Sequence, residues 1–476
     1  MDRRAFAPVD TVAHIWTSLG LPEHALKSIH LPVDAECLPS SFKVSHLAQA
    51  SIGLSALSAA LVWSLRHHQQ VPEVTVPARH ACAEFKSERL YILNGKAAPS
   101  NIGTIGGLHK TRDGYIRMHD GFPNHRENAL KILSLGHDAT REDVSRKMLE
   151  WNSLDLEIKA IEEGAVVARL RSFEEWDALP HSNAVADFPI LLTKISEGTV
   201  YPAKSIEPVQ DTKCLRGLRV VEMSRVIAAP VAGKTLAVHG ADVLWITSPT
   251  LPDLPDVDVD VSRGKRTVRL DIKTAVDKAK LLELLSTADV FIQSYRPGSL
   301  AAHGFSNQEL LALNPKLVIA SLNAYGPDGP WSHRRGFDSL VQTCSGINVA
   351  DAERYAAGEA ARVLPCQALD HGSGYLLATG IMAALYKRAT EGGSYEVKVS
   401  LAGVMRYLRS LGQYEGQSGF DRKDFKQPKD IIEYLDSRQT GLGVLKAVKH
   451  AAFIDGLKVG WEHMPKPLGS DEAVWL

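Results

Sequence analysis

The sequence predicts an α/β fold, with a Rossmann-like parallel sheet as a large domain and a smaller α+β domain beside it. In the second half, short apolar segments alternate with amphipathic ones, as strands alternate with helices in a doubly wound sheet. The first half differs, because Gly and Asn interrupt it and its pattern indicates helices and a hairpin. A length of 476 residues exceeds what one core usually supports, so at least two domains are expected.

The second half supplies the strands of the predicted sheet. Each is a short apolar run, and KRTVRLDI also alternates with period two. The expected strands are 218–223, 243–246, 265–272, 289–295 and 316–326, with an amphipathic helix at 275–288. Ligands of such sheets bind beyond the carboxyl ends of the strands. Chemistry is therefore expected in the loops 224–228, 294–298 and 323–329.

The first half is expected to hold the smaller domain. Residues 90–120 predict a loop and a hairpin, and 141–165 predict a pair of helices. The stretch from Leu179 to Cys214 is polar and contains prolines, so it is a candidate linker.

Composition excludes several classes of function. The net charge of −1 shows no basic excess, so no nucleic-acid partner is expected. The five cysteines are scattered, and the 18 histidines show no metal-ligand spacing, so neither a metal site nor a disulfide framework is predicted. The apolar run Ala50–Leu65 is short for a membrane span and contains four serines, so we interpret it as a buried helix. The N-terminus lacks an apolar signal core, and a cytoplasmic protein is expected.

Two segments form a weak internal repeat. Ser45–Val76 and Leu369–Val399 each contain a helix with Ala-Ala-Leu, followed by a short strand. Aligning Ala59 with Ala383 gives an offset of 383 − 59 = 324 residues. Asp370 then corresponds to His46, so only the second copy has a carboxylate at this place.

The stretch AAPVAGKT, Ala228–Thr235, resembles a phosphate-binding loop with Ala in place of the first Gly. Pro230 removes one of the backbone N–H groups on which such a loop depends. We therefore expect Gly233, Lys234 and Thr235 to lie inside a helix. A nucleotide hydrolase stays an alternative.

The stretch SRGKRTVRLD, Ser262–Asp271, places three cations just before a strand. They form either a solvated loop or a patch for a phosphorylated ligand, and alone the stretch favours the solvated loop.

Asp370 in LDHGSG precedes a long apolar helix. An Asp at a helix start caps free N–H groups and gains from the helix dipole. A cap explains the Asp but does not explain Gly372 and Gly374. Small residues beside a carboxylate would allow a bulky ligand to approach it. We expect the carboxylate to stay ionised there, as a nucleophile requires. The residues alone leave cap and nucleophile open.

The second half resembles the family III CoA-transferases, the group that contains formyl-CoA transferase and carnitine CoA-transferase. The resemblance runs from Leu215 to Leu401 and rests on five ordered segments. These are LRGLRVVEMSRVIAAPVAGKTLAVHGADVLWI, RGKRTVRLDIK, ADVFIQSYRPGSLAAHGFSNQELLALNPKLVIASLNAYGPDGP, FDSLVQTCSGI and LDHGSGYLLATGIMAALYKR.

The remaining parts resemble the rest of the family's chain in another order. TRDGYIRMHDG and residues 141–176 are similar to its small domain and return segment, and MPKPLGSDEAVWL to a fragment of its end. The resemblance thus implies half-repeats in swapped order, in a partly duplicated member of a kind expected in filamentous fungi. The expected domains are a partial repeat with the small domain (1–205), the large domain (213–415) and a C-terminal extension with a partial small-domain remnant (416–476).

The resemblance implies an enzyme that moves CoA from an acyl-CoA donor, such as acetyl-CoA or succinyl-CoA, to a carboxylic acid. Asp370 matches the family's nucleophile, which forms an aspartyl anhydride and then an aspartyl-CoA thioester. No cofactor beyond coenzyme A is implied, a homodimer of interlocked chains is expected, and secondary metabolism is the expected setting. The residues expected to contact CoA are Val226, Ile227, Arg266, Ser294, Tyr295, Arg296, Asn323 and Tyr325, with Gly106 and Gly107 in a closing loop.

Two further alternatives stay open. The same superfamily includes α-methylacyl-CoA racemases, which pair a His with an Asp as acid and base. Phe337 stands where the racemase His is expected, and its ring cannot carry a proton. The other alternative is a non-catalytic, CoA-binding remnant, because the first copy has His46 in place of Asp.

Overall fold

The large domain is built on a seven-stranded sheet. The structure, a computed structural model, describes residues 2–99, 103–201 and 213–476. Six neighbouring strands are parallel, and an antiparallel strand closes one edge. In spatial order the strands are β11 (Arg266–Arg269), β10 (Asp242–Thr247), β9 (Arg219–Met223), β12 (Val290–Gln293), β13 (Val318–Asn323), β14 (Ser394–Ser400) and β8 (Ile190–Ser196). The parallel part has the 3-2-1-4-5-6 order of the Rossmann fold, so this prediction is confirmed.

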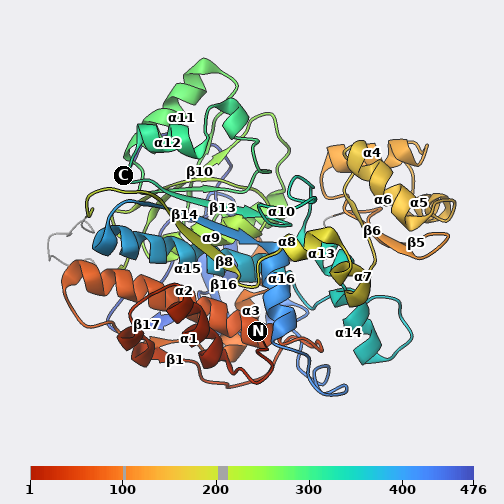
Figure 1. The fold of residues 1–476 in the computed structure, drawn as a ribbon, viewed down its shortest axis with the longest axis horizontal. Helices are drawn as coiled ribbons and strands as arrows, with labels where there is room; N and C mark the ends of the chain where they lie inside the picture. Colours follow the sequence, from red (N-terminus) through yellow and green to blue (C-terminus); the bar gives the residue numbers. More distant parts are fainter. Residues whose placement is uncertain (1, 100–102, 202–212) are drawn as a thin grey trace.

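Helices cover both faces of the sheet (Figure 1). Alternate strand residues belong to two separate apolar cores: Val221 and Phe291 pack with α11 and α12, and Val220 and Ile292 with α9 and α15. This alternation follows from the two-residue period of a strand. The helices are α9 (Ala228–Val238), α10 (Pro255–Val261), α11 (Ala275–Thr287), α12 (Asn307–Leu313), α13 (Asp338–Cys344), α14 (Ile347–Tyr355), α15 (Ala368–Glu391) and α16 (Leu401–Ser410).

The smaller α+β domain lies to one side of the large domain (Figure 1) and has an apolar core of its own. It contains the predicted hairpin and helical pair. Its elements are β5 (Gly107–Lys110), β6 (Tyr115–Met118), α4 (Pro123–Ile132), α5 (Arg141–Met148), α6 (Ser153–Glu162) and β7 (Val167–Arg169). Two short helices, α7 (Phe173–Asp177) and α8 (Pro180–Ala184), lead back to the large domain.

The predicted linker is wrong for its first part. Residues 190–196 form β8, which pairs with β14 in the large sheet, and α8 lies just before it. Polar residues such as Thr193 and Lys194 suit β8 because it is an edge strand with one unpaired side, and Pro189 stands just before the strand. Residues 202–212 of the predicted linker lie outside the described residues.

The internal repeat agrees with the helix boundaries. The helix α2 (Val44–His67) and α15 differ by 368 − 44 = 324 at the start and by 391 − 67 = 324 at the end. The residues that precede them, Lys43 and Gln367, have nearly the same backbone angles, with φ of −77° and −76°. A strand and a helix follow in both copies. In the first copy these are β2 (Val74–Thr75) and α3 (Ala78–Glu84).

The first copy packs directly on the second, since α2 lies against α15 (Figure 1). By length and composition α2 could cross a membrane, but 89% of its most apolar window is buried inside the protein, as the interpretation of a core helix requires. Its neighbours at the N-terminal end are α1 (Pro8–Ser18), β1 (Ile29–His30) and the 3-10 helix η2 (Ser87–Arg89).

Strand pairing joins the first and last parts of the chain. The strand β17 (Phe453–Ile454) pairs with β2 of the first repeat, and a second sheet combines both ends of the chain. Its strands are β15 (Leu435–Thr440), β16 (Gly443–Val448), β3 (Ile92–Leu93) and β4 (Lys96–Ala97). The predicted segments 1–205, 213–415 and 416–476 are therefore interleaved in space.

Candidate active site

A cavity of about 990 Å³ opens at the carboxyl ends of the parallel strands. The loops after β9 and β12 both line it, and between these two strands the order of the sheet reverses. This crevice is where doubly wound folds bind their ligands. The predicted loops are confirmed as cavity walls at Arg225–Ala228, Ser294–Pro297 and Asn323.

Asp370 lies in the wall of this cavity, in the first turn of α15, and is 6% exposed. The carboxylate that caps this turn belongs to Asp338: its Oδ2 accepts the backbone N–H groups of Leu369 at 2.8 Å and of Asp370 at 3.0 Å. Among the described residues, none donates a hydrogen bond to the Asp370 carboxyl. Asp370 is therefore not the helix cap, and its side chain lines the cavity.

The surroundings of Asp370 act against the expectation that its carboxyl stays ionised. Burial raises the pKa of Asp370 well above its ordinary value, and the charges of Asp338 and Glu88 raise it further, while Arg89 acts in the opposite direction. Burial also raises the pKa of Asp338 to about 6, although the two N–H groups that it accepts favour its charged form. The buried carboxyls of Asp338 and Asp370 interact, and such a pair disfavours ionisation of both groups. The helix dipole alone therefore does not decide the charge of Asp370.

The glycines after Asp370 serve helix packing, which corrects the predicted role in ligand approach. A Cβ on Gly374 would lie 2.5 Å from the carbonyl oxygen of Ala228 and 2.6 Å from Cβ of Val231. A Cβ on Gly372 would lie 3.1 Å from Leu47 Cδ2. Close approach of α9 and α2 requires these small residues, and it brings the start of α15 beside the loop after β9.

Six of the ten predicted CoA-contacting residues line the cavity with Asp370. They are Val226, Ile227, Ser294, Tyr295, Arg296 and Asn323. Val226 has a φ of +71°, which is strained for a β-branched residue and turns the chain from β9 into α9. Asn323 Oδ1 accepts the backbone N–H of Gly326 at 2.6 Å and so closes its own loop.

The other four lie elsewhere. Arg266 is buried and makes a bidentate pair with Asp242, at 2.8 and 2.9 Å from Nη2, so its guanidinium is not available to a phosphate. Tyr325 is buried, and its carbonyl oxygen lies 2.9 Å from Nε2 of His181. Gly106 and Gly107 lie at the start of β5 and do not line the cavity.

The basic stretch before β11 is neither a solvated loop nor a phosphate patch. Arg263 pairs with Asp260, and Lys265 pairs with Glu222 at 2.8 Å. All four side chains are buried. Both interpretations are wrong. Asp260 lies only three residues before Arg263, but Glu222 comes from β9, and burial of all four side chains depends on the tertiary fold.

Several cavity residues escaped prediction from sequence. Arg225 belongs to a predicted loop, and Lys273 follows β11, so the rule of strand ends could have found both. Arg335 and His125 also line the cavity. His125 comes from α4 of the small domain, and nothing in its sequence surroundings indicates this position. Arg225 lies over the ring of Phe122 at 4.4 Å, which joins the small domain to the loop after β9.

Phe337 lines the cavity and also packs against the small domain. Its ring stacks on His119 with centroids 3.8 Å apart, and its centroid is 5.9 Å from that of His125. Burial lowers the pKa of both histidines to about 4, so the rings are neutral at pH 7. In the first repeat, His46 is also a neutral core residue: it is buried, 2.7 Å from Thr11 Oγ1, and burial lowers its pKa to about 3.

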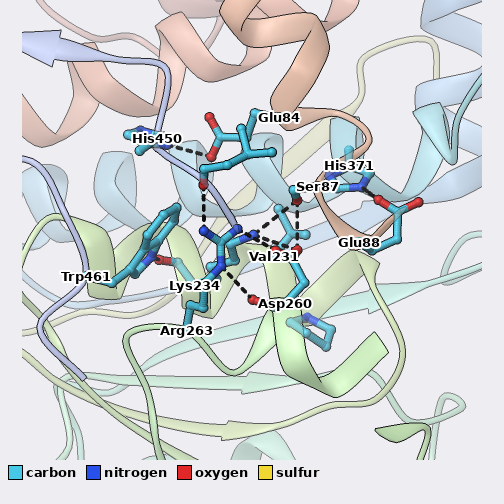
Figure 2. A network of polar contacts seen from close by, with 12 residues as sticks. Glu84, Ser87, Glu88, Val231, Lys234, Asp260, Arg263, His371, His450 and Trp461 are labelled. Atoms are coloured by element: carbon cyan, nitrogen blue, oxygen red, sulfur yellow. Dashed lines mark hydrogen bonds and ion pairs between the residues drawn. The ribbon is translucent and has the colours of Figure 1, made fainter. Parts of the chain in front are cut away.

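Lys234 lies inside α9, as expected, and belongs to a buried polar network (Figure 2). Its Nζ lies 2.7 Å from Asp260 Oδ2 and 3.2 Å from Ser87 Oγ, and Trp461 Nε1 donates to its carbonyl oxygen. A phosphate-loop lysine must reach a ligand. This one is enclosed by α9, α10, η2 and the C-terminal segment, so the nucleotide hydrolase loses its support.

The fold and the cavity together define a class of protein. It is a doubly wound α/β protein in which a buried carboxyl, that of Asp370, lines the cavity at the point where the strand order reverses. Among the described residues, no group of three or more His, Cys, Asp or Glu could hold a metal ion. The model of CoA-transferase family III matches residues 215–425. The chain belongs to this family, and the predicted enzyme class, a CoA-transferase, is confirmed at that level.

Two fungal proteins are among its relatives. An acyl-CoA transferase of Gibberella moniliformis is 32% identical over 409 residues, which are 77% of this chain and 71% of that protein. An acetyl-coenzyme A transferase of Hypoxylon pulicicidum is 30% identical over 343 residues, or 67% of this chain and 56% of that one.

Bacterial relatives match a smaller part. A probable fatty acyl-CoA transferase of Mycobacterium tuberculosis is 32% identical over 48% of this chain and 60% of its own length. A solved structure of a protein from the same organism covers 43% of this chain at 30% identity, with a TM-score of 0.37. The chain thus spans little more than half of several relatives, and the swapped order of its half-repeats stays a prediction.

Proposed function

We propose that this protein transfers CoA from an acyl-CoA donor to a carboxylic acid through Asp370. The observation that carries the proposal is the free Asp370 carboxyl in the wall of a cavity large enough for an acyl-CoA. Asp338 caps α15, so the Asp370 carboxyl is available for covalent chemistry. Cations from several loops line the same cavity and suit an anionic thioester: Arg225, Lys273, Arg296 and Arg335.

The reaction proceeds in four exchanges at carbonyl carbon. The Asp370 carboxylate attacks the carbonyl carbon of the donor thioester, and the C–S bond breaks. CoA thiolate is released, and Asp370 and the donor acyl group form a mixed anhydride. The thiolate attacks the aspartyl carbonyl, which releases the donor acid and leaves CoA on Asp370 as a thioester. The acceptor carboxylate attacks that carbonyl and displaces the thiolate, which then attacks the acceptor's acyl carbon of the new anhydride. The acceptor leaves as its CoA thioester, and the Asp370 carboxylate is restored.

The buried position of Asp370 suits these intermediates. Anhydrides and thioesters hydrolyse, and a site that excludes water protects them. The same burial raises the pKa of Asp370, and attack requires the ionised carboxylate. The proposed donor is acetyl-CoA, with succinyl-CoA as the alternative. Support for acetyl-CoA comes from the name of the Hypoxylon relative, an acetyl-coenzyme A transferase.

Isotope exchange tests this function without knowledge of the natural acceptor. Labelled acetate is incubated with acetyl-CoA and the protein, and a family III mechanism moves label into acetyl-CoA. Intact mass is expected to show CoA minus water on Asp370, and hydroxylamine is expected to remove it. Absence of exchange and adduct with both acetyl-CoA and succinyl-CoA, each with its own acid, would support the non-catalytic remnant instead.

A second candidate is exchange of the α-proton of a 2-methylacyl-CoA. One observation favours it: His125 and Asp370 line the same cavity, so an imidazole and a carboxyl share this site although Phe337 stands where the racemase His is expected. Its lowered pKa, about 4, makes His125 a weak base. Uptake of deuterium at the α-carbon, lost in His125→Ala, would establish this activity.

The setting of the reaction is also a proposal. We infer an enzyme of secondary metabolism that acts in the cytoplasm, and the fungal relatives support the metabolic setting. Fractionation of cells that express a tagged protein tests the location. A homodimer is proposed as well, and the native mass of the particle tests it.

A further inference from the structure

The first repeat, taken here as Ser45–Val76 with the segment that follows it up to Arg89, contacts His371, the residue after Asp370. Glu88 Oε2 accepts a hydrogen bond from Nε2 of His371 at 2.9 Å. Phe85 stacks on the same ring, with centroids 5.4 Å apart. Leu47 of α2 packs against Gly372 in the same turn of α15. Contacts from three places in the first repeat therefore meet the helix turn that carries Asp370.

Glu88 is itself held in place (Figure 2). It lies in η2 beside Ser87, whose hydroxyl donates to Asp260 at 2.8 Å, and Asp260 pairs with Lys234 of α9. The side chains of Glu88 and His371 are 3% and 1% exposed. A buried charge-assisted pair of this kind has little freedom to reorient.

Glu88 also acts on Asp370 through its charge. The charges that shift the pKa of Asp370 come from Asp338 on α13 and from Glu88 and Arg89 on η2. Arg89 Nε lies 3.1 Å from Glu88 Oε1 and partly compensates it. Position and charge are therefore two separable effects of the same side chain.

We propose that Glu88, contributed by the first repeat, is a positioning residue of the catalytic centre. By holding His371 it fixes the first turn of α15 and the direction in which the Asp370 carboxyl enters the cavity. This inference rests on the proposed function of Asp370, and it gives the first repeat a part in catalysis although His46 has replaced its own aspartate. Misplacing a reacting group by about 1 Å can cost on the order of 100-fold in rate.

Two conservative variants separate position from charge. Glu88→Gln keeps the length of the side chain and an oxygen that accepts from His371, but loses the charge. Glu88→Asp keeps the charge and withdraws the carboxylate by one methylene. Positioning predicts that Glu88→Asp lowers the kcat of acetate exchange roughly 10-fold or more, while Glu88→Gln stays within about threefold of wild type and both keep the KM for acetyl-CoA. The reverse order of the two variants would overturn the proposal.

Glu84 offers a matched control. It lies on α3 of the same repeat, is equally buried, and pairs with His450 of the C-terminal segment at 2.8 Å. Its contact with α15 is to Tyr375, beyond the first turn that carries Asp370. Glu84→Asp is expected to lower the melting temperature as much as Glu88→Asp and to leave the kcat of the folded protein unchanged. Equal losses of kcat in the two variants would show a merely structural role for Glu88.

A measurement without turnover keeps this inference distinct from the proposed function. A small water-soluble carbodiimide with an amine nucleophile modifies accessible carboxyls, and peptide mass spectrometry follows the rate at Asp370. The rate is expected to change in Glu88→Asp and to match wild type in Glu84→Asp. If wild type shows no exchange, the proposed function fails while the labelling rates still decide the placement of Asp370. Unchanged labelling in Glu88→Asp would overturn the positioning role.

Discussion

Asp338 caps the helix that carries Asp370, accepting its backbone N–H at 3.0 Å. The two carboxyls are 32 residues apart in the chain and differ in what they bind. Asp338 accepts two N–H groups and is fully buried, whereas the Asp370 carboxyl faces the cavity. The cap of α15 is therefore Asp338, and the reactive role of Asp370 stays a proposal.

Replacing Asp338 is expected to separate its two effects. Asp338→Ala loses the cap and should lower the free energy of unfolding by about 1–2 kcal/mol. Asp338→Asn keeps an acceptor oxygen but removes a charge that raises the pKa of Asp370. The acidic limb of kcat against pH should therefore move to lower pH in Asp338→Asn.

Ser306 provides the control for capping, because its side chain caps α12 away from the cavity. Ser306→Ala is expected to lose a similar free energy of unfolding and to keep the wild-type pH profile. An unmoved acidic limb in Asp338→Asn would contradict the electrostatic coupling of the two carboxyls.

Asp370→Asn is expected to abolish exchange and to stabilise the fold at neutral pH. The pKa of Asp370 is raised on folding, so folding favours its protonated form. Below the ordinary pKa of an aspartate, about 4, wild type and variant should be equally stable. As the pH rises from there, wild type should lose about 1.4 kcal/mol for each unit by which folding raises the pKa. Urea unfolding between pH 3 and pH 8 measures this, and equal stability at pH 8 would contradict a raised pKa.

Gly374→Ala is expected to separate α15 from α9. Its Cβ would lie 2.5 Å from a backbone oxygen, which cannot move aside as a side chain can. We expect a loss of roughly 2–3 kcal/mol in the free energy of unfolding. Gly372→Ala meets only side-chain atoms, at 3.1 and 3.3 Å, and should cost less. Urea unfolding of both variants checks the order, and a more stable Gly374→Ala would refute the tight contact.

Lys234→Met is expected to destabilise the protein without affecting any nucleotide site. Removing one partner of a buried pair costs about 3 kcal/mol or more, although Arg263 and Ser87 remain beside Asp260. The exposed pair of Lys280 and Glu283 is the control, and Lys280→Met should change stability by less than about 1 kcal/mol. Titration with ATP and Mg²⁺ should detect no binding in wild type. Binding that Lys234→Met removes would restore the phosphate-loop interpretation.

Much of the fold could be predicted because its signals are local. The apolar pattern that predicts a strand or a helix lies within the element's own contiguous residues, as in β9, β13 and α11. Ligand loops follow from strand order, so Ser294 and Asn323 could be placed at a cavity from sequence. The shared 324-residue offset of α2 and α15 is likewise visible in one dimension.

The failures concern residues whose partners lie far away in the chain. Arg266 appears as a free cation in the sequence, but Asp242 on the neighbouring strand binds it. In the sequence Gly374 lies near a carboxylate, but in the structure the backbone of α9 packs so closely against it that no side chain fits there. The role of a charged side chain or of a glycine depends on the residues that pack against it, and the local sequence pattern does not contain that information.

The sequence by itself determined a parallel α/β sheet and the ligand loops at its edge, because strand and helix periods are properties of contiguous residues. It also indicated Asp370 at a helix start, and the family resemblance favoured it as the nucleophile. Only the tertiary structure decided the surroundings of Asp370. Asp338 removes the capping role, α2 and α9 account for the glycines, and Glu88 reaches His371 across 283 residues of chain. Burial and charge act through space, so the pKa and direction of the carboxyl depend on neighbours that only folding brings together.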